Sequence, residues 1–180
     1  MFRIASVLAA VLMAVASVPL VTSGTAAAAG LDLTCTPPSS ASLLFDPPAT
    51  SSPQTMTLTV SRQYGPCVSA TRPDITSGHS TATGTSSGAT CLSLLGANAL
   101  TITITWNTGE TSVLSGNNVS SLSGLTLTVV TTGTVTSGVF TGATFVHTIV
   151  YPSTNILLCN LGLGTLSALY GQVVLEIITP

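Results

Sequence analysis

Residues 99–115 read A-L-T-I-T-I-T-W-N-T-G-E-T-S-V-L-S and set the pattern for the rest of the chain. Leucine and isoleucine alternate with threonine as far as Trp106, the only tryptophan of the sequence. A period of two residues is typical of a strand with one apolar and one polar face. The link N-T-G at 107–109 predicts a short turn with Gly109 in the left-handed region, so this stretch is predicted to form a β-hairpin.

The same alternation recurs along most of the chain after residue 30. Met56, Leu58 and Val60 are each separated by a threonine, and no stretch in this part has the i, i+3, i+4, i+7 spacing of an amphipathic helix. About seven to ten short strands with Gly-rich turns predict an all-β domain. We predict an antiparallel β-sandwich of Ig-like or Greek-key type, with a β-barrel as the alternative.

Two segments are poor in large apolar residues. Residues 72–85 are the most polar part of the chain and are predicted to form an edge strand or a long loop. Residues 115–122 are rich in Gly, Asn and Ser and are predicted to form a loop.

The N-terminus has the organisation of a secretory signal peptide. The basic start M-F-R precedes an apolar run over 4–18, and four alanines at 26–29 provide A-x-A cleavage sites. A membrane anchor is the alternative, because a span needs roughly 18 apolar residues, but no basic stop-transfer cluster follows. We predict a signal peptide over 1–29 and a single secreted domain over 30–180, extracellular or at the cell surface.

The chain is almost uncharged. Charged residues make up 4% of the sequence, against about 25% in ordinary soluble proteins, and lysine is absent. Nucleic-acid binding and docking to anionic lipid both need clustered Lys and Arg. We therefore predict no nucleic-acid partner, and no membrane partner once the signal peptide is removed.

Four cysteines remain after export: Cys35, Cys67, Cys91 and Cys159. An even number in an oxidising compartment predicts two disulfides, for which three pairings can be written. The competing interpretation is a zinc site, which needs C-x-x-C or similarly close spacing, and the sequence has none. We predict neither a metal nor a cofactor.

Residues 91–159 contain a series of short motifs, C-L-S-L-L-G, T-I-T-W-N-T-G-E-T-S, G-T-V-T-S-G-V-F-T-G and I-V-Y-P, followed by Cys159. With these motifs the chain resembles small exported, four-cysteine, Thr/Ser-rich β proteins of actinobacteria, a group without an assigned activity. The resemblance extends from Cys35 through the last strand. It implies secretion, a β-sandwich and the disulfides Cys35–Cys67 and Cys91–Cys159, and it implies no catalytic residue.

Candidate catalytic groups are few. Residues 84–88, G-T-S-S-G, match the G-x-S-x-G nucleophile motif, but that motif requires a strand, a strained turn and a helix, which this context does not predict. The general-base candidates are His79, which with Asp74 could serve Ser86, and His147, which lies in an apolar strand. We predict no enzymatic activity and no catalytic residue, with a hydrolase using Ser86 or His79 as the alternative.

The threonine ladders are the stronger functional signal. Stacked on neighbouring strands, Thr101, Thr103 and Thr105 would present a lattice able to bind ice or a polysaccharide. Threonine also suits the solvent face of an ordinary strand, and sheet twist opposes a flat lattice. Residues 126–140 are β-prone, uncharged and free of proline, which suits self-association or an internal strand pair.

The sequence therefore predicts a secreted, non-enzymatic binding or structural protein. Its predicted partner is an unknown extracellular ligand, such as a cell-wall polymer, or a second copy of the chain.

Overall fold

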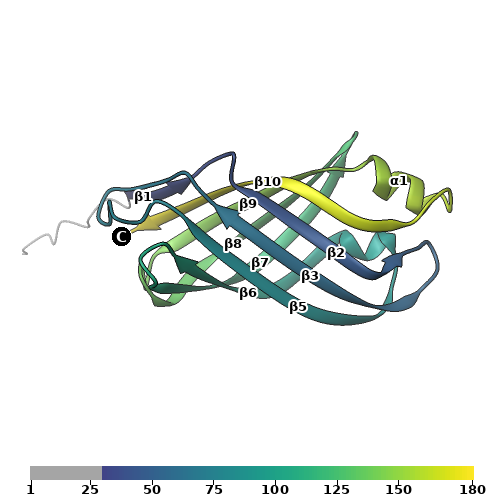
Figure 1. Cartoon of the computed structure of the whole chain (residues 1–180), viewed down its shortest axis with the longest axis horizontal. Coiled ribbons are helices and arrows are strands. Elements are labelled where there is room, and N and C mark those ends of the chain that lie inside the picture. Colours follow the sequence, from purple (N-terminus) through teal and green to yellow (C-terminus); the bar gives the residue numbers. More distant parts are fainter. Residues whose placement is uncertain (1–29) are drawn as a thin grey trace, which may run out of the picture.

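The structure is a computed structural model that describes residues 30–180. The predicted signal peptide lies outside the described residues. Two short helices, η1 (Cys91–Leu94) and α1 (Thr154–Asn160), accompany ten strands (Figure 1). The strands are β1 (Gly30–Cys35), β2 (Ser40–Ala49), β3 (Gln54–Tyr64), β4 (Cys67–Ser69), β5 (Gly78–Ala89), β6 (Gly96–Trp106), β7 (Thr111–Ser123), β8 (Thr126–Gly138), β9 (Thr144–Pro152) and β10 (Leu166–Thr179). Neither helix within residues 30–180 is long and apolar enough to cross a membrane.

The strands form a closed antiparallel barrel. Eight of them follow the order β2-β3-β5-β6-β7-β8-β9-β10, and β10 pairs back with β2, where Gln172 faces Ser40. The C-terminal half of β10 pairs with β1. β4 in turn pairs with β1 and lies outside the eight-stranded barrel. The predicted β-sandwich is therefore wrong. Alternation describes one apolar face of a sheet, which a sandwich and a barrel share, whereas closure depends on pairing between strands that are far apart in the sequence.

Of the two weakly apolar segments, only residues 115–122 differ from their prediction. Residues 115–122 lie in β7, which pairs along its length with β6 and β8, so tertiary pairing overrides their loop-like composition. Gly116 faces Gly133 on β8, and a Cβ on either glycine would overlap the backbone of the other strand. The glycine pair thus allows the close approach of two backbones that a curved barrel wall needs. In residues 72–85, the strand β5 begins at Gly78 and pairs throughout with β3, while its other edge pairs with β6 only at Gly78 and His79, so most of this segment is an edge strand as predicted.

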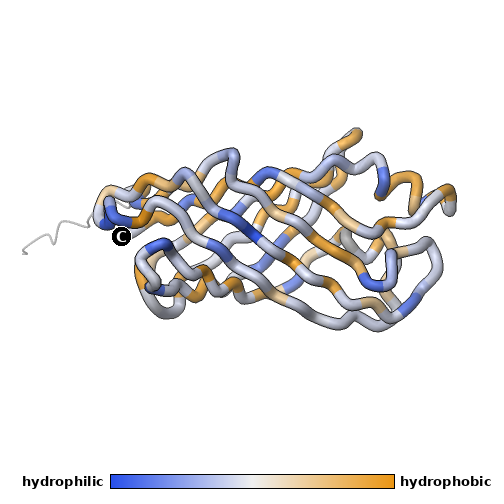
Figure 2. Tube along the Cα trace, viewed as in Figure 1, coloured by the Kyte–Doolittle hydropathy of each residue, from blue (hydrophilic) through white to orange (hydrophobic). Residues whose placement is uncertain are grey.

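The predicted alternation on β6 is confirmed. Ile102, Ile104 and Trp106 are buried in the barrel interior, while Thr101 and Thr103 are exposed on its outside. Gly109 has φ 83° in the turn that follows, as predicted. Figure 2 shows this pattern as short orange segments between pale ones along the strands, with blue confined to a few short stretches.

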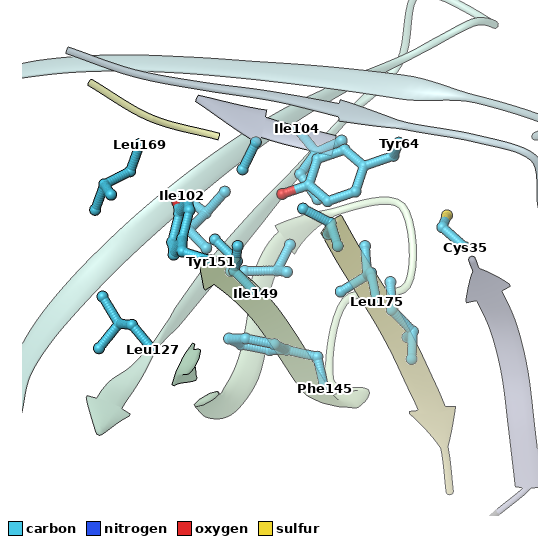
Figure 3. Packing of buried hydrophobic residues seen from close by; sticks show 14 of the residues in the cluster. Cys35, Tyr64, Ile102, Ile104, Leu127, Phe145, Ile149, Tyr151, Leu169 and Leu175 are labelled. Atoms are coloured by element: carbon cyan, nitrogen blue, oxygen red, sulfur yellow. The ribbon is translucent and has the colours of Figure 1, made fainter. Parts of the chain in front are cut away.

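One half of the interior is densely filled, and we call it the packed end. Trp106 donates from Nε1 to Ser112 Oγ at 2.8 Å, and its ring lies 6.5 Å from that of Tyr64 between centroids. A Cβ on Gly78 would lie 2.7 Å from Trp106 Cε3, so the indole occupies the space above this glycine. Figure 3 shows side chains from several strands, among them Tyr64 and Ile104, meeting in the interior.

The structure contains two disulfides, Cys35–Cys67 and Cys91–Cys159, which are the pairs implied by the resemblance. The first joins β1 to β4 at the packed end, and the second joins η1 to α1 at the opposite end of the barrel.

Candidate ligand-binding cavity

The half of the barrel opposite the packed end contains a cavity of about 620 Å³. Its walls come from the inward-facing positions of the same strands that fill the packed end. The aliphatic lining residues include Leu43, Leu58, Val60, Leu100, Val129 and Ile149. Small residues, among them Ala82 and Gly84 on β5, leave the centre unfilled.

The cavity extends between β5 and β6. These strands pair at only two positions, Gly78 with Trp106 and His79 with Thr105, and they are not paired beyond them. Residues of both unpaired stretches line the cavity, as does Leu95, which follows η1. The Cys91–Cys159 disulfide ties this connection to α1. The incomplete pairing of β5 with β6 therefore gives the interior a side opening next to a covalently fixed segment.

The polar floor of the cavity is formed around Arg62. This residue continues the inward-facing series of Met56, Leu58 and Val60 on β3, and only 9% of it is exposed. Its Nε is buried without a hydrogen-bond partner, and both ion pairs found within residues 30–180 are formed by Arg72 instead. Burying a charge without a partner is costly, so such a group normally has a functional or structural reason.

The groups around Arg62 are neutral. Burial, followed by the nearby charge of Arg62, lowers the pKa of His147 to about 3, and His147 Nε2 lies 3.3 Å from the hydroxyl of Tyr64. Burial raises the pKa of Tyr64 well above its ordinary value and that of Tyr151 to about 12, although Arg62 acts in the opposite direction on both phenols. At neutral pH these three side chains are therefore uncharged.

The carboxylates lie elsewhere. Asp32 accepts hydrogen bonds from Ser69, Ala70 and Thr71 on the far side of β1. Burial opposes ionisation of Asp32, but these hydrogen bonds outweigh it and lower its pKa. Asp74 and Glu110 both bind the exposed guanidinium of Arg72, which lowers the pKa of each carboxylate.

Asp46 and Glu176, the other two acidic residues, occupy outward positions on β2 and β10. All five acidic side chains of the sequence thus lie outside the cavity, whose lining residues include none of them.

The structure separates the candidate catalytic residues. Residues 84–88 lie within the extended strand β5, not at a turn into a helix. On this strand Ser86 faces the cavity and His79 lies exposed on the outside, so the two point to opposite faces. Within residues 30–180, no three His, Cys, Asp or Glu side chains are grouped so that they could hold a metal ion.

The predicted threonine face is only partly assembled. Thr101 and Thr103 are exposed, but the neighbouring stretch of β5 is not paired with β6, and on β7 they face Ser115 and Val113. The closer threonine pair is Thr59 with Thr83 on β3 and β5, whose hydroxyl oxygens are 3.3 Å apart. Residues 126–138 form β8, which is paired on both edges, so its backbone is already used within the barrel.

The cavity and its buried arginine were not predicted from the sequence. The signal was present, because Arg62 falls on an inward position of an apolar alternation where an aliphatic residue is expected. This position alone could not show that Arg62 lines a cavity, because that depends on the closure of the sheet and on the small residues across the barrel.

Comparisons of the chain with protein-family models, with curated proteins and with solved structures found no match. The cavity is therefore the feature from which a function can be inferred.

Proposed function

We propose that this protein is a secreted, non-enzymatic binding protein that holds one small, largely apolar molecule inside its barrel. The cavity of about 620 Å³ carries the proposal. Small-molecule sites have volumes of about 300–1,000 Å³, mostly apolar walls and a few placed polar groups. A barrel of eight strands is also the size at which the interior can hold one small ligand.

Secretion is supported by two features. Residues 1–29 have the pattern of a signal peptide, and two disulfides are typical of proteins from oxidising compartments. A carrier that works outside the cell must keep its cavity open without cellular cofactors. The disulfide between η1 and α1 supports this, since it fixes the chain beside the cavity.

A binding role, in preference to catalysis, is supported by the positions of the reactive side chains. Ser86 faces the cavity without His79, which lies on the other face of the same strand. His147 is buried and neutral and hydrogen-bonds with a phenol, Tyr64, that burial also keeps neutral. Neither arrangement gives a hydroxyl an adjacent base and a third group to orient it.

Titration with an uncharged, apolar fluorescent probe such as N-phenylnaphthylamine tests the proposal. We expect saturable binding to one site. Gly84 faces the cavity and a Cβ there would have no atom within 4 Å, so Gly84→Trp should fill the space and weaken binding by about tenfold or more.

Thr85→Trp is the matched control, because this neighbour is exposed on the outside of the same strand. It should bind the probe as the unmodified protein does. Absence of saturable binding, or equal affinities for the two variants, would contradict the proposal.

A further inference from the structure

We propose that the ligand is an amphiphile with an apolar body and a single carboxylate, and that Arg62 binds the carboxylate at the floor of the cavity. This inference rests on the proposed function and adds the chemical class of the ligand. It depends on three observations: a buried arginine without a counterion, a neutral set of neighbours, and uncharged cavity walls that include a group of aliphatic side chains.

The first observation is the missing counterion. Arg62 is nine-tenths buried, its Nε has no hydrogen-bond partner in the structure of residues 30–180, and it lines the cavity. The chain supplies no carboxylate to it, because all five acidic side chains are placed elsewhere. A guanidinium in this position lacks an anion, and the cavity is the route by which an external anion can reach it.

The second observation is the neutrality of the surroundings. The titratable groups that line the cavity with Arg62 are His147 and Tyr151, and Tyr64 lies beside His147. Burial keeps the two phenols protonated and the imidazole unprotonated at neutral pH. The floor therefore carries one net positive charge, which matches a monoanion better than a phosphate with two charges.

The third observation is the arrangement of polar and apolar groups. Leu43, Leu58, Val60 and Leu100 line the cavity, and Arg62 is the only lining residue that carries a charge at neutral pH. An apolar chain or ring can contact these walls while its acidic end reaches the floor. The planar guanidinium presents parallel N–H donors that suit the two oxygens of a carboxylate.

Competition binding with dodecanoate and methyl dodecanoate tests the inference, using displacement of the neutral probe by each. These ligands share the same apolar chain, and only the acid has a charge. We expect the acid to bind about tenfold or more tightly than the ester, as for a hydrogen-bonded charge pair in a partly dry site.

Substitution of Arg62 separates charge from shape. Arg62→Met should remove the preference for the acid and leave ester affinity within about twofold, while Arg62→Lys should keep part of the preference. Arg72→Met is the matched control, because Arg72 is bound to Asp74 and Glu110 outside the cavity, and it should change neither affinity.

The outcomes distinguish this inference from the proposed function. If the unmodified protein binds acid and ester equally, or if Arg62→Met weakens both alike, the role of Arg62 is wrong while the cavity remains a binding site. If neither ligand nor the neutral probe binds, the proposed function fails and this inference fails with it. Because the acid–ester comparison needs only the unmodified protein, the test holds even if Arg62→Met does not fold.

Discussion

The packed end and the cavity half of the barrel are built from the same strands, yet only the second of them contains a cavity. At the packed end the inward positions carry Trp106, Ile104 and Tyr64, whose side chains lie together in the interior. Along the same β5, the inward positions of the other half carry the small residues Ala82, Gly84 and Ser86. Equal periodicity thus produces a core in one place and a cavity in the other, and side-chain volume makes the difference.

The difference extends to strand pairing. β5 and β6 are hydrogen-bonded to each other only beside Trp106, where the core is dense, and they are unpaired where the cavity begins. Arg62 and His147 lie at the boundary, since each lines the cavity and His147 also contacts Tyr64 of the packed end. Stability and ligand binding should therefore depend on different halves of the barrel.

Truncation of an aliphatic side chain should show the largest difference in stability between the two halves. Ile104 is fully buried, so Ile104→Ala should lower the free energy of unfolding by about 4 kcal/mol through lost burial and a new void. Leu58 is half-buried and already borders the cavity, so Leu58→Ala should cost about 1 kcal/mol. Urea unfolding followed by fluorescence of the single tryptophan measures both. Similar losses would mean that the two halves are equally packed.

Acidification should lower the stability of the barrel through His147, which lies between the two halves. Between about pH 6.5 and pH 3 the unfolded chain binds a proton at His147 that the folded barrel excludes, because the pKa of this residue falls from 6.5 to about 3 on folding. The free energy of unfolding should therefore decrease as the pH falls, by about 1.4 kcal/mol per pH unit in that window.

The change from pH 6 to pH 4.5 reports mainly on His147, because the fold lowers the pKa of Asp32, Asp74 and Glu110 and so moves their titration to lower pH. His147→Gln should flatten the profile there. A flat profile in the unmodified protein would contradict the buried, neutral state of His147.

The same substitution, glycine to alanine, can be made in both halves of β5. The expected difference in stability is smaller, but the added group is identical. Gly78→Ala forces a Cβ to within 2.7 Å of Trp106 Cε3 and should destabilise the fold by about 2 kcal/mol. Gly84→Ala places its Cβ in open space and should change stability by less than about 0.5 kcal/mol. Thermal unfolding measures the two differences, and equal shifts in Tm would show that the packed end tolerates extra volume.

The sequence predicted the strands better than their assembly. Alternation around Trp106 predicted which side chains of β6 are buried, and the Gly109 turn followed from its residue types. Closure was not predictable, because pairing of β2 with β10 joins residues such as Ser40 and Gln172 that no local pattern connects. The loop predicted over 115–122 failed for a related reason, since pairing on both edges outweighs the weak propensity of Gly, Asn and Ser.

The candidate site was less predictable than the fold. Small inward residues look unremarkable in a sequence, and they define a cavity only when the residues across the barrel are known. Arg62 was visible as a charge within an apolar alternation, but whether a carboxylate faced it depended on the fold. Conversely, Ser86 and His79 are close in sequence and have the residue types of a nucleophile and its base, yet they occupy opposite faces of one strand.

Methyl-resolved NMR during titration with dodecanoate tests the central claim, that the ligand binds inside the barrel, most directly. The inward methyl groups of Leu58, Val60 and Leu100 line the cavity, whereas those of Leu44 and Val119 are exposed on the outside. We predict saturable chemical-shift changes at the inward set and none at the outward set. Changes confined to Leu44 and Val119, with the inward methyl groups unaffected, would contradict a ligand site within the barrel.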